Sequence, residues 1–411
     1  MSSQDQALHL FEGYGIELEY MIVDRKSMDI LPVADKVLHA VASSYDNEVE
    51  MGRLAWSNEL VLHVIELKTN GPARILDDLP HLFRDDLEKI NEILFSMGGM
   101  LMPTAMHPWM NPERETRLWP HENNEIYQSY NRIFLCTGHG WSNVQSTHIN
   151  LPFSGDEEFS RLHSAIRVVL PIIPAIAASS PIVDMVFHGI LDYRMEAYRH
   201  NQERIGSIAG RIIPEAVTSR EEYERRILAP MYRDIAPYDP SGILQYEWLN
   251  SRGAIARFDR SAIEIRVVDI QECPLADIAI VHLITKVIRA LTEERLADSA
   301  DQQCMETDEL ADIFLDTIRD GEKAKIRNRA YLDLFGVPPD VRSFSALDLW
   351  AHLFERCGNT NPEWVVPITH ILTDGSLSTR ILSRLGDGFS PESLKEVYRE
   401  LCLCATENRL F

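Results

Sequence analysis

Near its N-terminus the chain reads Gly15-Ile16-Glu17-Leu18-Glu19-Tyr20. Side chains of a β-strand alternate between the two faces of a sheet, so the two glutamates point to one face and the three apolar residues to the other. This alternation is typical of an antiparallel sheet with one face on the core and one face open to water. Two neighbouring carboxylates on the open face favour the binding of a cation.

Three further segments of the chain repeat this pattern of polar residues on strand-like runs. The first spans residues 59–69 and ends at Asn70-Gly71-Pro72, the second spans residues 147–152, and the third spans residues 263–268. Their polar residues are Glu59 and Glu66, then His148 and Asn150, and finally Glu264 and Arg266. Together with the first stretch, four strands offer carboxylates, an imidazole, an amide and a guanidinium.

One such pair on its own usually indicates no more than a solvated sheet face. The coincidence of four strands favours a shared site. Carboxylate oxygens with some nitrogen suit Mg²⁺ or Mn²⁺, and Mg²⁺ in proteins binds through few carboxylates together with substrate phosphates. The sequence therefore predicts a metal site that serves a nucleotide.

Six short motifs, in order, resemble those of γ-glutamylcysteine synthetase-like carboxylate-amine ligases, the glutamate-cysteine ligase family 2. They are Gly15-Ile16-Glu17-Leu18-Glu19, Ile65-Glu66-Leu67-Lys68-Thr69, Met106-His107-Pro108, Thr147-His148-Ile149-Asn150, Ala178-Ser179-Ser180-Pro181 and Glu264-Ile265-Arg266. The resemblance covers residues 10–290. It implies an α+β fold of the glutamine synthetase-like kind, in which a curved antiparallel sheet has helices on its outer face. It also implies ATP- and Mg²⁺-dependent joining of a carboxylate to an amine through an acyl phosphate, with a γ-glutamyl product.

The resemblance also implies roles for individual residues. The expected metal ligands are Glu17, Glu19, Glu59, Glu66, His148 and Glu264. Arg266 would face the phosphates and act in catalysis, Arg194 would lie near the transferred phosphoryl group or the substrate carboxylate, and Asn150 would contact the cofactor. The chain departs from several relatives at Ser146-Thr147-His148, where they have His-x-His. This leaves one imidazole fewer.

Two other functions fit the same residue types. A metal-dependent amidase or hydrolase would use the histidine and the carboxylates to activate water, without ATP and with zinc or manganese. A catalytically inactive homologue would bind the nucleotide without turnover, and the missing imidazole favours this alternative. The sequence contains neither Gly-x-Ser-x-Gly nor a Gly-x-x-x-x-Gly-Lys loop, and a metal-assisted ligase needs neither.

Composition restricts the class of protein and its partners. The chain has 411 residues with 45% hydrophobic content, enough for one composite domain with a catalytic region at 1–290 and a helical region at 291–411 packed on it. The net charge of -23 disfavours nucleic acid and anionic membrane surfaces. The resemblance implies a small carboxylate and a small amine as partners. The six cysteines show no metal-binding spacing, and the N-terminus lacks a signal-peptide pattern. We expect reduced thiols, a cytoplasmic location, and C-terminal helices that could complete a homo-oligomer.

A coarse pass along the chain predicts where the elements lie. Strands are expected near 11–23, 60–69, 99–106, 143–152 and 262–268, and helices near 73–97, 122–136 and 156–178. Residues 182–260 are expected to form loops and short helices over the cavity. Amphipathic helices are expected near 275–297, 307–320, 345–357 and 390–405. The stretch Thr373–Arg380 is expected to form a turn that leads into a helix capped by Ser or Asp. An anion site at Arg380 is the alternative.

Overall fold

The computed structural model describes residues 8–357 and 361–411. Residues 1–6, on which the absence of a signal peptide was predicted, lie outside the described residues. In the part that is described, the helices are too short or too polar to cross a membrane. All six cysteines are free thiols, as expected.

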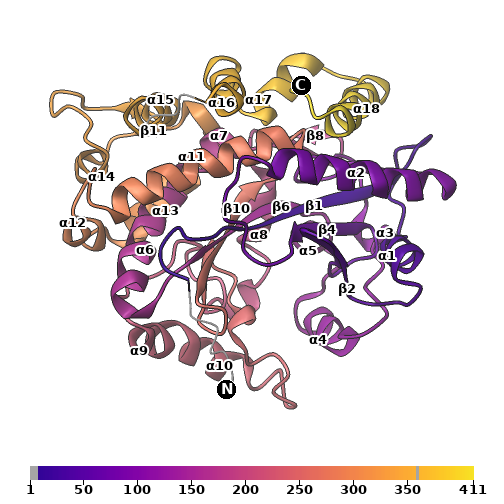
Figure 1. Ribbon diagram of the computed structural model, residues 1–411, viewed down its shortest axis with the longest axis horizontal. Coiled ribbons are helices and arrows are strands. Elements are labelled where there is room, and N and C mark those ends of the chain that lie inside the picture. Colours follow the sequence, from indigo (N-terminus) through magenta and orange to yellow (C-terminus); the bar gives the residue numbers. More distant parts are fainter. Residues whose placement is uncertain (1–7, 358–360) are drawn as a thin grey trace.

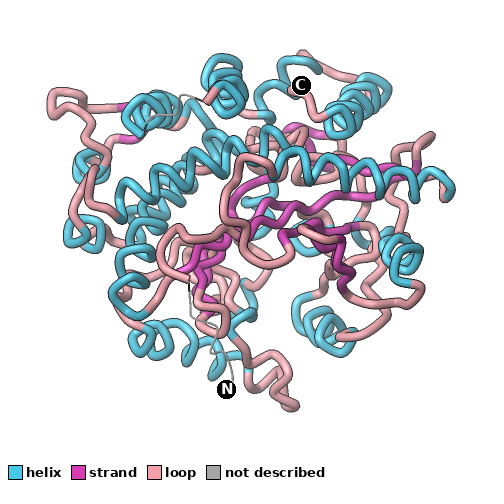
Figure 2. The backbone as a smooth tube through the Cα atoms, in the orientation of Figure 1, coloured by secondary structure: helices cyan, strands magenta, loops and turns pink. Residues whose placement is uncertain are grey.

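The centre of the molecule is one eight-stranded sheet in which every neighbouring pair is antiparallel. Its order is β2-β3-β4-β1-β6-β10-β9, and β5 pairs with the far end of β1. Its strands are β1 (Gly15–Asp24), β2 (Glu48–Met51), β3 (Leu54–Asn58), β4 (Val64–Thr69), β5 (Gly99–Met102), β6 (Ser146–Pro152), β9 (Ala254–Arg257) and β10 (Ala262–Asp269). Figure 2 shows that the strand direction turns strongly from one edge of this sheet to the other.

Helices cover the apolar face of the sheet, which confirms the expected α+β class. Ile16, Leu18 and Tyr20 of β1 are fully buried, and they belong to one hydrophobic core with residues of α2 (Leu79–Ser96), α6 (Gly155–Val169) and α11 (Pro274–Thr292). In α2, Phe83, Leu87, Ile90 and Leu94 are buried because their spacing of three to four residues places them on one side of the helix. Figure 1 shows α2 and α11 above the strands of the sheet in this view, with α2 running beside β1.

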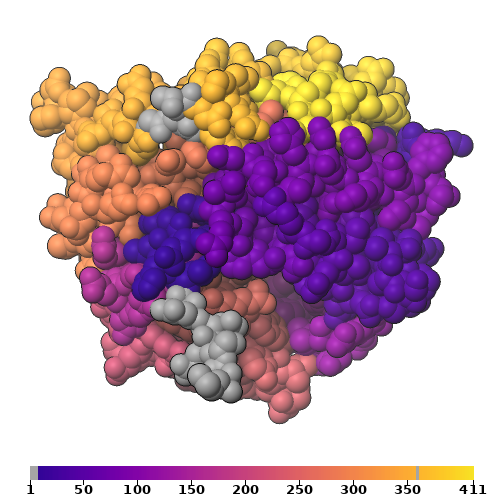
Figure 3. Space-filling view, in the orientation of Figure 1, coloured from indigo at the N-terminus to yellow at the C-terminus, as the bar shows by residue number. Residues whose placement is uncertain are grey.

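The remaining helices lie around this centre. The N-terminal half contains α1 (Ala34–Ala42), α3 (Pro112–Glu115), α4 (Asn124–Phe134), α5 (His139–Ser142) and α7 (Pro174–Ala177). The middle contains α8 (Tyr193–Tyr198), α9 (Arg220–Tyr223), α10 (Ala229–Ile235) and the short β7–β8 hairpin (Ile182–Val183 and Val186–Phe187). The C-terminal part contains α12 (Ser299–Gln303), α13 (Thr307–Asp320), α14 (Arg329–Leu334), α15 (Ala346–Cys357), α16 (Pro362–Asp374), α17 (Leu377–Leu385), α18 (Pro391–Glu407), and the small β11–β12 pair (Lys325–Ile326 and Phe344–Ser345). Figure 3 shows this C-terminal part, in orange and yellow, along one side of the molecule.

The structure corrects several predicted boundaries. The helix expected from residue 73 begins at Leu79, and the strand expected to reach residue 106 ends at Met102. Strands β2, β3 and β9 were not predicted, and β9 lies inside the segment that we expected to consist of loops and short helices. The helix expected at 156–178 is divided at Pro171 and Pro174 into α6, a short 3-10 turn and α7.

The predicted turn before α17 has a different role from the one expected. Ser376 occupies the position before the helix, but its side chain makes no capping bond and donates instead to Glu322 Oε2 at 3.1 Å. Arg380 is buried in an ion pair with Glu272, at 2.6 Å between Nη1 and Oε1. Neither side-chain capping nor an anion site at Arg380 is found, because both groups have buried acidic partners.

Candidate active site

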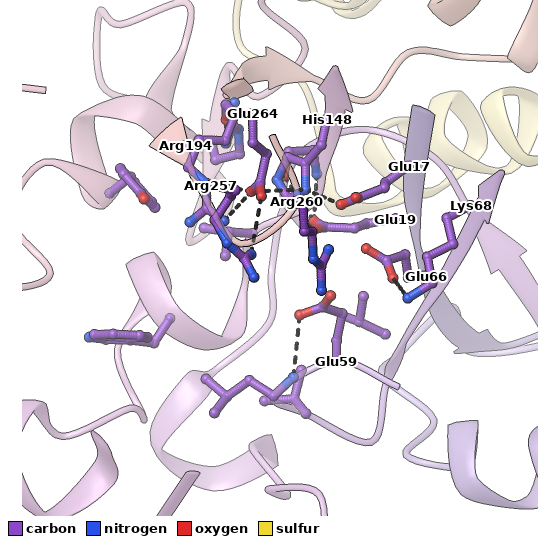
Figure 4. A pocket seen from close by; sticks show the side chains of 18 residues that line it. Glu17, Glu19, Glu59, Glu66, Lys68, His148, Arg194, Arg257, Arg260 and Glu264 are labelled. Atoms are coloured by element: carbon purple, nitrogen blue, oxygen red, sulfur yellow. Dashed lines mark hydrogen bonds and ion pairs between the residues drawn. The ribbon is translucent and has the colours of Figure 1, made fainter. Parts of the chain in front are cut away.

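The open face of the sheet brings the predicted polar residues into one cavity of about 310 Å³. The wall contains five carboxylates and five cationic side chains, together with His148 and a few apolar residues. Of the predicted site residues, it includes Glu17, Glu19, Glu59, Glu66, His148, Arg194, Glu264 and Arg266. Figure 4 shows the side chains of Glu17, Glu19, Glu59, Glu66, His148 and Glu264 around a common space.

Strand register determines which of these residues meet. Glu19 of β1 lies opposite Glu66 of β4, and on the other edge of β1, Glu17 lies opposite His148 of β6. Glu264 of β10 lies opposite Asn150 of β6. Because residues directly opposite each other on neighbouring strands have closely spaced side chains, four strands separated by long stretches of sequence supply one compact cluster.

His148 lies at the centre of the cluster. Its Nδ1 is 2.8 Å from Glu17 Oε2, and its Nε2 is 3.7 Å from Glu19 Oε1. Burial opposes a charged imidazole here, but the hydrogen bond to Glu17 and the charges of Glu19 and Glu17 raise the pKa of His148 to about 9. Burial likewise raises the pKa of Glu17, yet the contact with His148 outweighs it and holds that pKa below its ordinary value.

Ser146 lies where the family resemblance led us to expect a second imidazole. Its backbone N–H donates to Glu19 Oε2 at 2.7 Å, and its hydroxyl donates to the same oxygen at 3.0 Å. The hydroxyl is also 3.0 Å from His148 Nε2. A hydroxyl therefore orients the carboxylate of Glu19 at this position.

The positive charge around Glu59 and Glu66 is too small to stabilise both carboxylates in their charged form. Burial, followed by the charges of neighbouring glutamates, raises the pKa of Glu59 well above its ordinary value. The same causes raise the pKa of Glu66, although Lys68 lies 3.3 Å away and Ser57 donates a hydrogen bond. Carboxylates crowded in this way hold a surplus of negative charge that a cation would neutralise.

Two groups of residues have the spacing of a metal site. Glu17, Glu66 and His148 form one, and Glu19, Glu59 and Glu66 form the other; in each group the ligand atoms lie within 4.8 Å of one another. The groups share Glu66, so two neighbouring ions could use it in common. Donors that are mainly carboxylate oxygens with one imidazole fit Mg²⁺ or Mn²⁺.

Glu264 lies at the edge of these groups, next to the arginines. Arg266 donates from Nε to Glu264 Oε1 at 3.0 Å and also contacts it through Nη2. The pairing of β10 with β6 shifts between Ile265 and Val268, so Arg266 lies in a bulge. A bulge of this kind bends the strand and changes the direction of its side chains.

Arg194 lies deeper in the wall. Its Nε contacts the buried Asp269, and its Nη1 donates to the backbone oxygen of Arg266 at 3.2 Å. Its Nη2 is buried and makes no hydrogen bond with the described residues. The guanidinium is therefore held in place by Asp269 and keeps one unsatisfied group beside the cavity.

Asn150 differs from the other predicted residues, because it lines a second cavity of about 600 Å³. Its Nδ2 donates to Glu17 Oε1 at 3.0 Å. The two cavities share Glu17, Lys68 and Arg260 in their walls, so they adjoin at the carboxylate cluster.

Several lining residues were not predicted as part of the site. Lys68 follows Glu66 at the strand period of two, which could have indicated that it belongs to the same face. Arg257 approaches Glu264 Oε2 at 3.8 Å from β9. Arg260 lies in the turn between β9 and β10. Ser57 of β3 does not line the cavity but contacts Glu66, which does. Since these strands are short and were missed, their side chains could not be assigned to the cavity.

Comparisons with known proteins show what this chain is similar to. Residues 14–399 match the profile of glutamate-cysteine ligase family 2 (GCS2). An "Uncharacterized protein" of Archaeoglobus fulgidus is 33% identical over 97% of this chain and 99% of its own length. A Bradyrhizobium protein named "Putative glutamate--cysteine ligase 2" is 25% identical over 68% of this chain and 61% of its own length. The solved structure of the ligase PafA, in complex with the prokaryotic ubiquitin-like protein Pup, aligns with a TM-score of 0.47 and 12% identity over 93% of this chain and 71% of that chain.

Proposed function

This chain belongs to glutamate-cysteine ligase family 2, and from this we propose that it is an ATP- and Mg²⁺-dependent carboxylate-amine ligase that forms a γ-glutamyl-type amide. Family membership supports the ligase class. The principal support for the mechanism is the convergence of five glutamates and His148 on one cavity beside Arg266 and Arg194. Residues 1–290 would contain the catalytic region, and residues 291–411 would support it.

The proposed reaction activates a carboxylate that would not otherwise form an amide at neutral pH. A carboxylate oxygen attacks the γ-phosphorus of ATP and ADP leaves, giving an acyl phosphate. The amine nitrogen then attacks the acyl carbon, phosphate leaves, and the nitrogen loses a proton. This chemistry needs no nucleophilic side chain, in agreement with the motifs that the sequence lacks.

The residues of the cavity suit this reaction. Glu17, Glu19, Glu59, Glu66 and His148 would hold Mg²⁺, with Glu264 at the edge of the site. Bound Mg²⁺ would neutralise charge on the phosphates of ATP. Arg266 and Arg194 lie opposite the carboxylates and would stabilise the negative charge of the phosphoryl group during transfer. The second cavity, with Asn150 in its wall, has room for the nucleoside part of ATP.

The experiment that tests this function is Mg²⁺-dependent phosphate release from ATP against a panel of amino acids, singly and in pairs, with mass detection of amides. Release that requires both an acid and an amine would establish the ligase and identify its substrates. ATP binding without release for any pair would contradict turnover and support the inactive homologue. If the protein neither binds ATP nor releases phosphate, the proposal is contradicted and a metal-dependent hydrolase is favoured.

A further inference from the structure

A third cavity, of about 160 Å³, lies between the segment after β4 and helix α11. Three cationic side chains line it, Arg74 from the segment and Lys286 and Arg289 from the helix, against one acidic side chain, Asp77. This excess of positive charge is local, because the whole chain has 63 acidic and 40 basic residues. A concave surface with one predominant sign of charge attracts counter-ions of the opposite sign.

The cations of this cavity are poorly neutralised by the protein. The side chains of Arg74 and Lys286 make no hydrogen bond or ion pair with residues 8–357 or 361–411. Lys286 is half-buried, so part of its hydration is lost without compensation from a carboxylate. Arg289 pairs with Glu293 at 2.8 Å between Nε and Oε1, which leaves its other nitrogens available.

Two hydroxyl groups line this cavity, together with His282 and the apolar side chains of Ile75 and Leu76. Thr285 and Lys286 lie one turn from Arg289 along α11, so the three share one face of the helix. Thr285 is 5% exposed, and its hydroxyl has no hydrogen-bond partner among the described residues. Tyr14 lines the opposite side of the cavity. Ammonium, guanidinium and hydroxyl donors around a small space suit a compact oxyanion, and the volume is small for a whole nucleotide.

The segment after β4, which contains Arg74, lies between this cavity and the second cavity of the candidate active site. Tyr14 and Ala73 pair through two backbone hydrogen bonds of 2.8 Å each. Gly13 and Pro72, next to them in sequence, line the larger cavity, whereas Tyr14 and Arg74 line the smaller one. One wall, in which these two segments are joined by a β-bridge, therefore contacts both cavities.

We propose that the smaller cavity binds a compact phosphoryl anion and that the bound anion changes the nucleotide affinity of the larger cavity through their shared wall. The second half of this inference rests on the proposed function. The anion could be free phosphate or the phosphoryl group of a metabolite, since the recognising chemistry is the same. By linkage, an anion that orders the wall would change nucleotide binding, and the nucleotide would change anion binding by the same factor.

Calorimetric titration with inorganic phosphate tests the site, with EDTA present so that the metal cluster cannot hold the anion. The Lys286→Met variant should weaken binding by about tenfold, and a further Arg74→Met change should abolish it. Lys36→Met, which removes an exposed lysine on α1, is the matched control and should bind like the wild type. No binding by the wild type, or equal affinity in Lys286→Met, would overturn the site. A parallel titration with glycerol 3-phosphate separates the two sources, because tighter binding of the ester indicates a metabolite and tighter binding of phosphate indicates the free anion.

Measuring ATP affinity with and without phosphate tests the coupling. A shift in the wild type that Lys286→Met lacks would support it, whereas equal shifts in both would assign the effect to the active site and overturn the coupling. Phosphate binding that depends on Lys286 in a protein that binds no ATP would contradict the proposed function and leave the anion site standing.

Discussion

Glu59 is the carboxylate of the cavity whose environment least favours its charge. Its pKa is raised in the folded protein, so on raising the pH the unfolded chain loses the Glu59 proton before the folded protein does. The contribution of Glu59 to stability therefore falls as the pH rises from about 4.5 toward the folded pKa. Glu59→Gln should therefore raise the unfolding free energy of the metal-free protein at pH 8, by about 1 kcal/mol or more. Denaturant unfolding with EDTA measures this change.

The exposed Glu50 of β2 offers the matched control, and Glu50→Gln should leave the stability unchanged. With saturating Mg²⁺ the wild type should be more stable than Glu59→Gln, because the wild type gains metal binding that the substitution has weakened. A less stable Glu59→Gln protein in EDTA would contradict the assignment of excess negative charge.

Glu264 tests the cluster through turnover. Glu264→Gln keeps the shape of the side chain and an oxygen that can accept from Arg266, but it removes the charge. We expect ATP turnover to fall by about 100-fold or more while the folded structure is retained, because electrostatic stabilisation supplies most of the catalysis in phosphoryl transfer. Steady-state kinetics and circular dichroism measure the two effects, and wild-type turnover would remove Glu264 from the site.

Arg266 contacts one oxygen of Glu264 through two of its nitrogens. Arg266→Lys keeps the positive charge but cannot reproduce a planar fork of donors. It should lower kcat by at least about tenfold, with a smaller effect on the stability of the fold. If kcat stays at the wild-type value, the guanidinium geometry is not needed in the reaction.

At the level of elements, Asp269 at the end of β10 joins three segments. It accepts from the backbone of Ser179 and the hydroxyl of Ser180, each at 2.9 Å, and it pairs with Arg194 at the start of α8. Asp269 is fully buried, and so is its partner. Asp269→Asn would remove the charge of the carboxylate that contacts this guanidinium in the interior.

This change should lower the unfolding free energy by about 3 kcal/mol or more, because breaking one side of a buried ion pair leaves an uncompensated charge. Chemical denaturation measures it, with the exposed Asp387→Asn as the control. A loss no greater than that of the control would show that the ion pair does not hold α8 against the sheet.

Strands in which polar and apolar residues alternate over several positions were predictable from the sequence, and short strands were not. Strands β1, β4, β6 and β10 were expected because each alternates polar and apolar residues over several positions. By contrast, β3 reads Leu54-Ala55-Trp56-Ser57-Asn58 and is buried at four of five positions, so it shows no period of two. Its burial comes from packing of distant segments, which local sequence does not encode.

For the whole molecule, buried histidines predict sensitivity to acid. Burial lowers the pKa of His63 and of His107 to about 4, and that of His163 to about 3, against a usual value of 6.5. Below pH 6.5 the unfolded chain therefore binds protons that the folded protein does not. The contribution of these three histidines to stability should be complete above pH 6.5 and be lost as the pH drops toward 4, by up to about 3 kcal/mol for each histidine.

His163 gives the sharpest test of this sensitivity, because neither ring nitrogen has a hydrogen-bond partner among the described residues. It packs against Phe159 at 5.2 Å between ring centroids, so His163→Phe should be accommodated. Melting temperatures between pH 7 and pH 4 should then decline less steeply than in the wild type. His188→Phe, at an exposed position, should leave the slope unchanged, and equal slopes in all three proteins would refute the idea.

The amino-acid sequence was enough to predict which side chains share a strand face, because alternation is a local property of the backbone. Glu17 and Glu19, Glu66, and His148 were thereby predicted to lie on an open face, and motif order indicated the family. Only the tertiary structure decided that Glu17 meets His148, that Glu19 meets Glu66, and that Arg257, Arg260 and Lys68 complete the wall. Strand order and register between distant segments depend on the packing of the whole core, and a shift of one residue would turn each of these side chains to the other face.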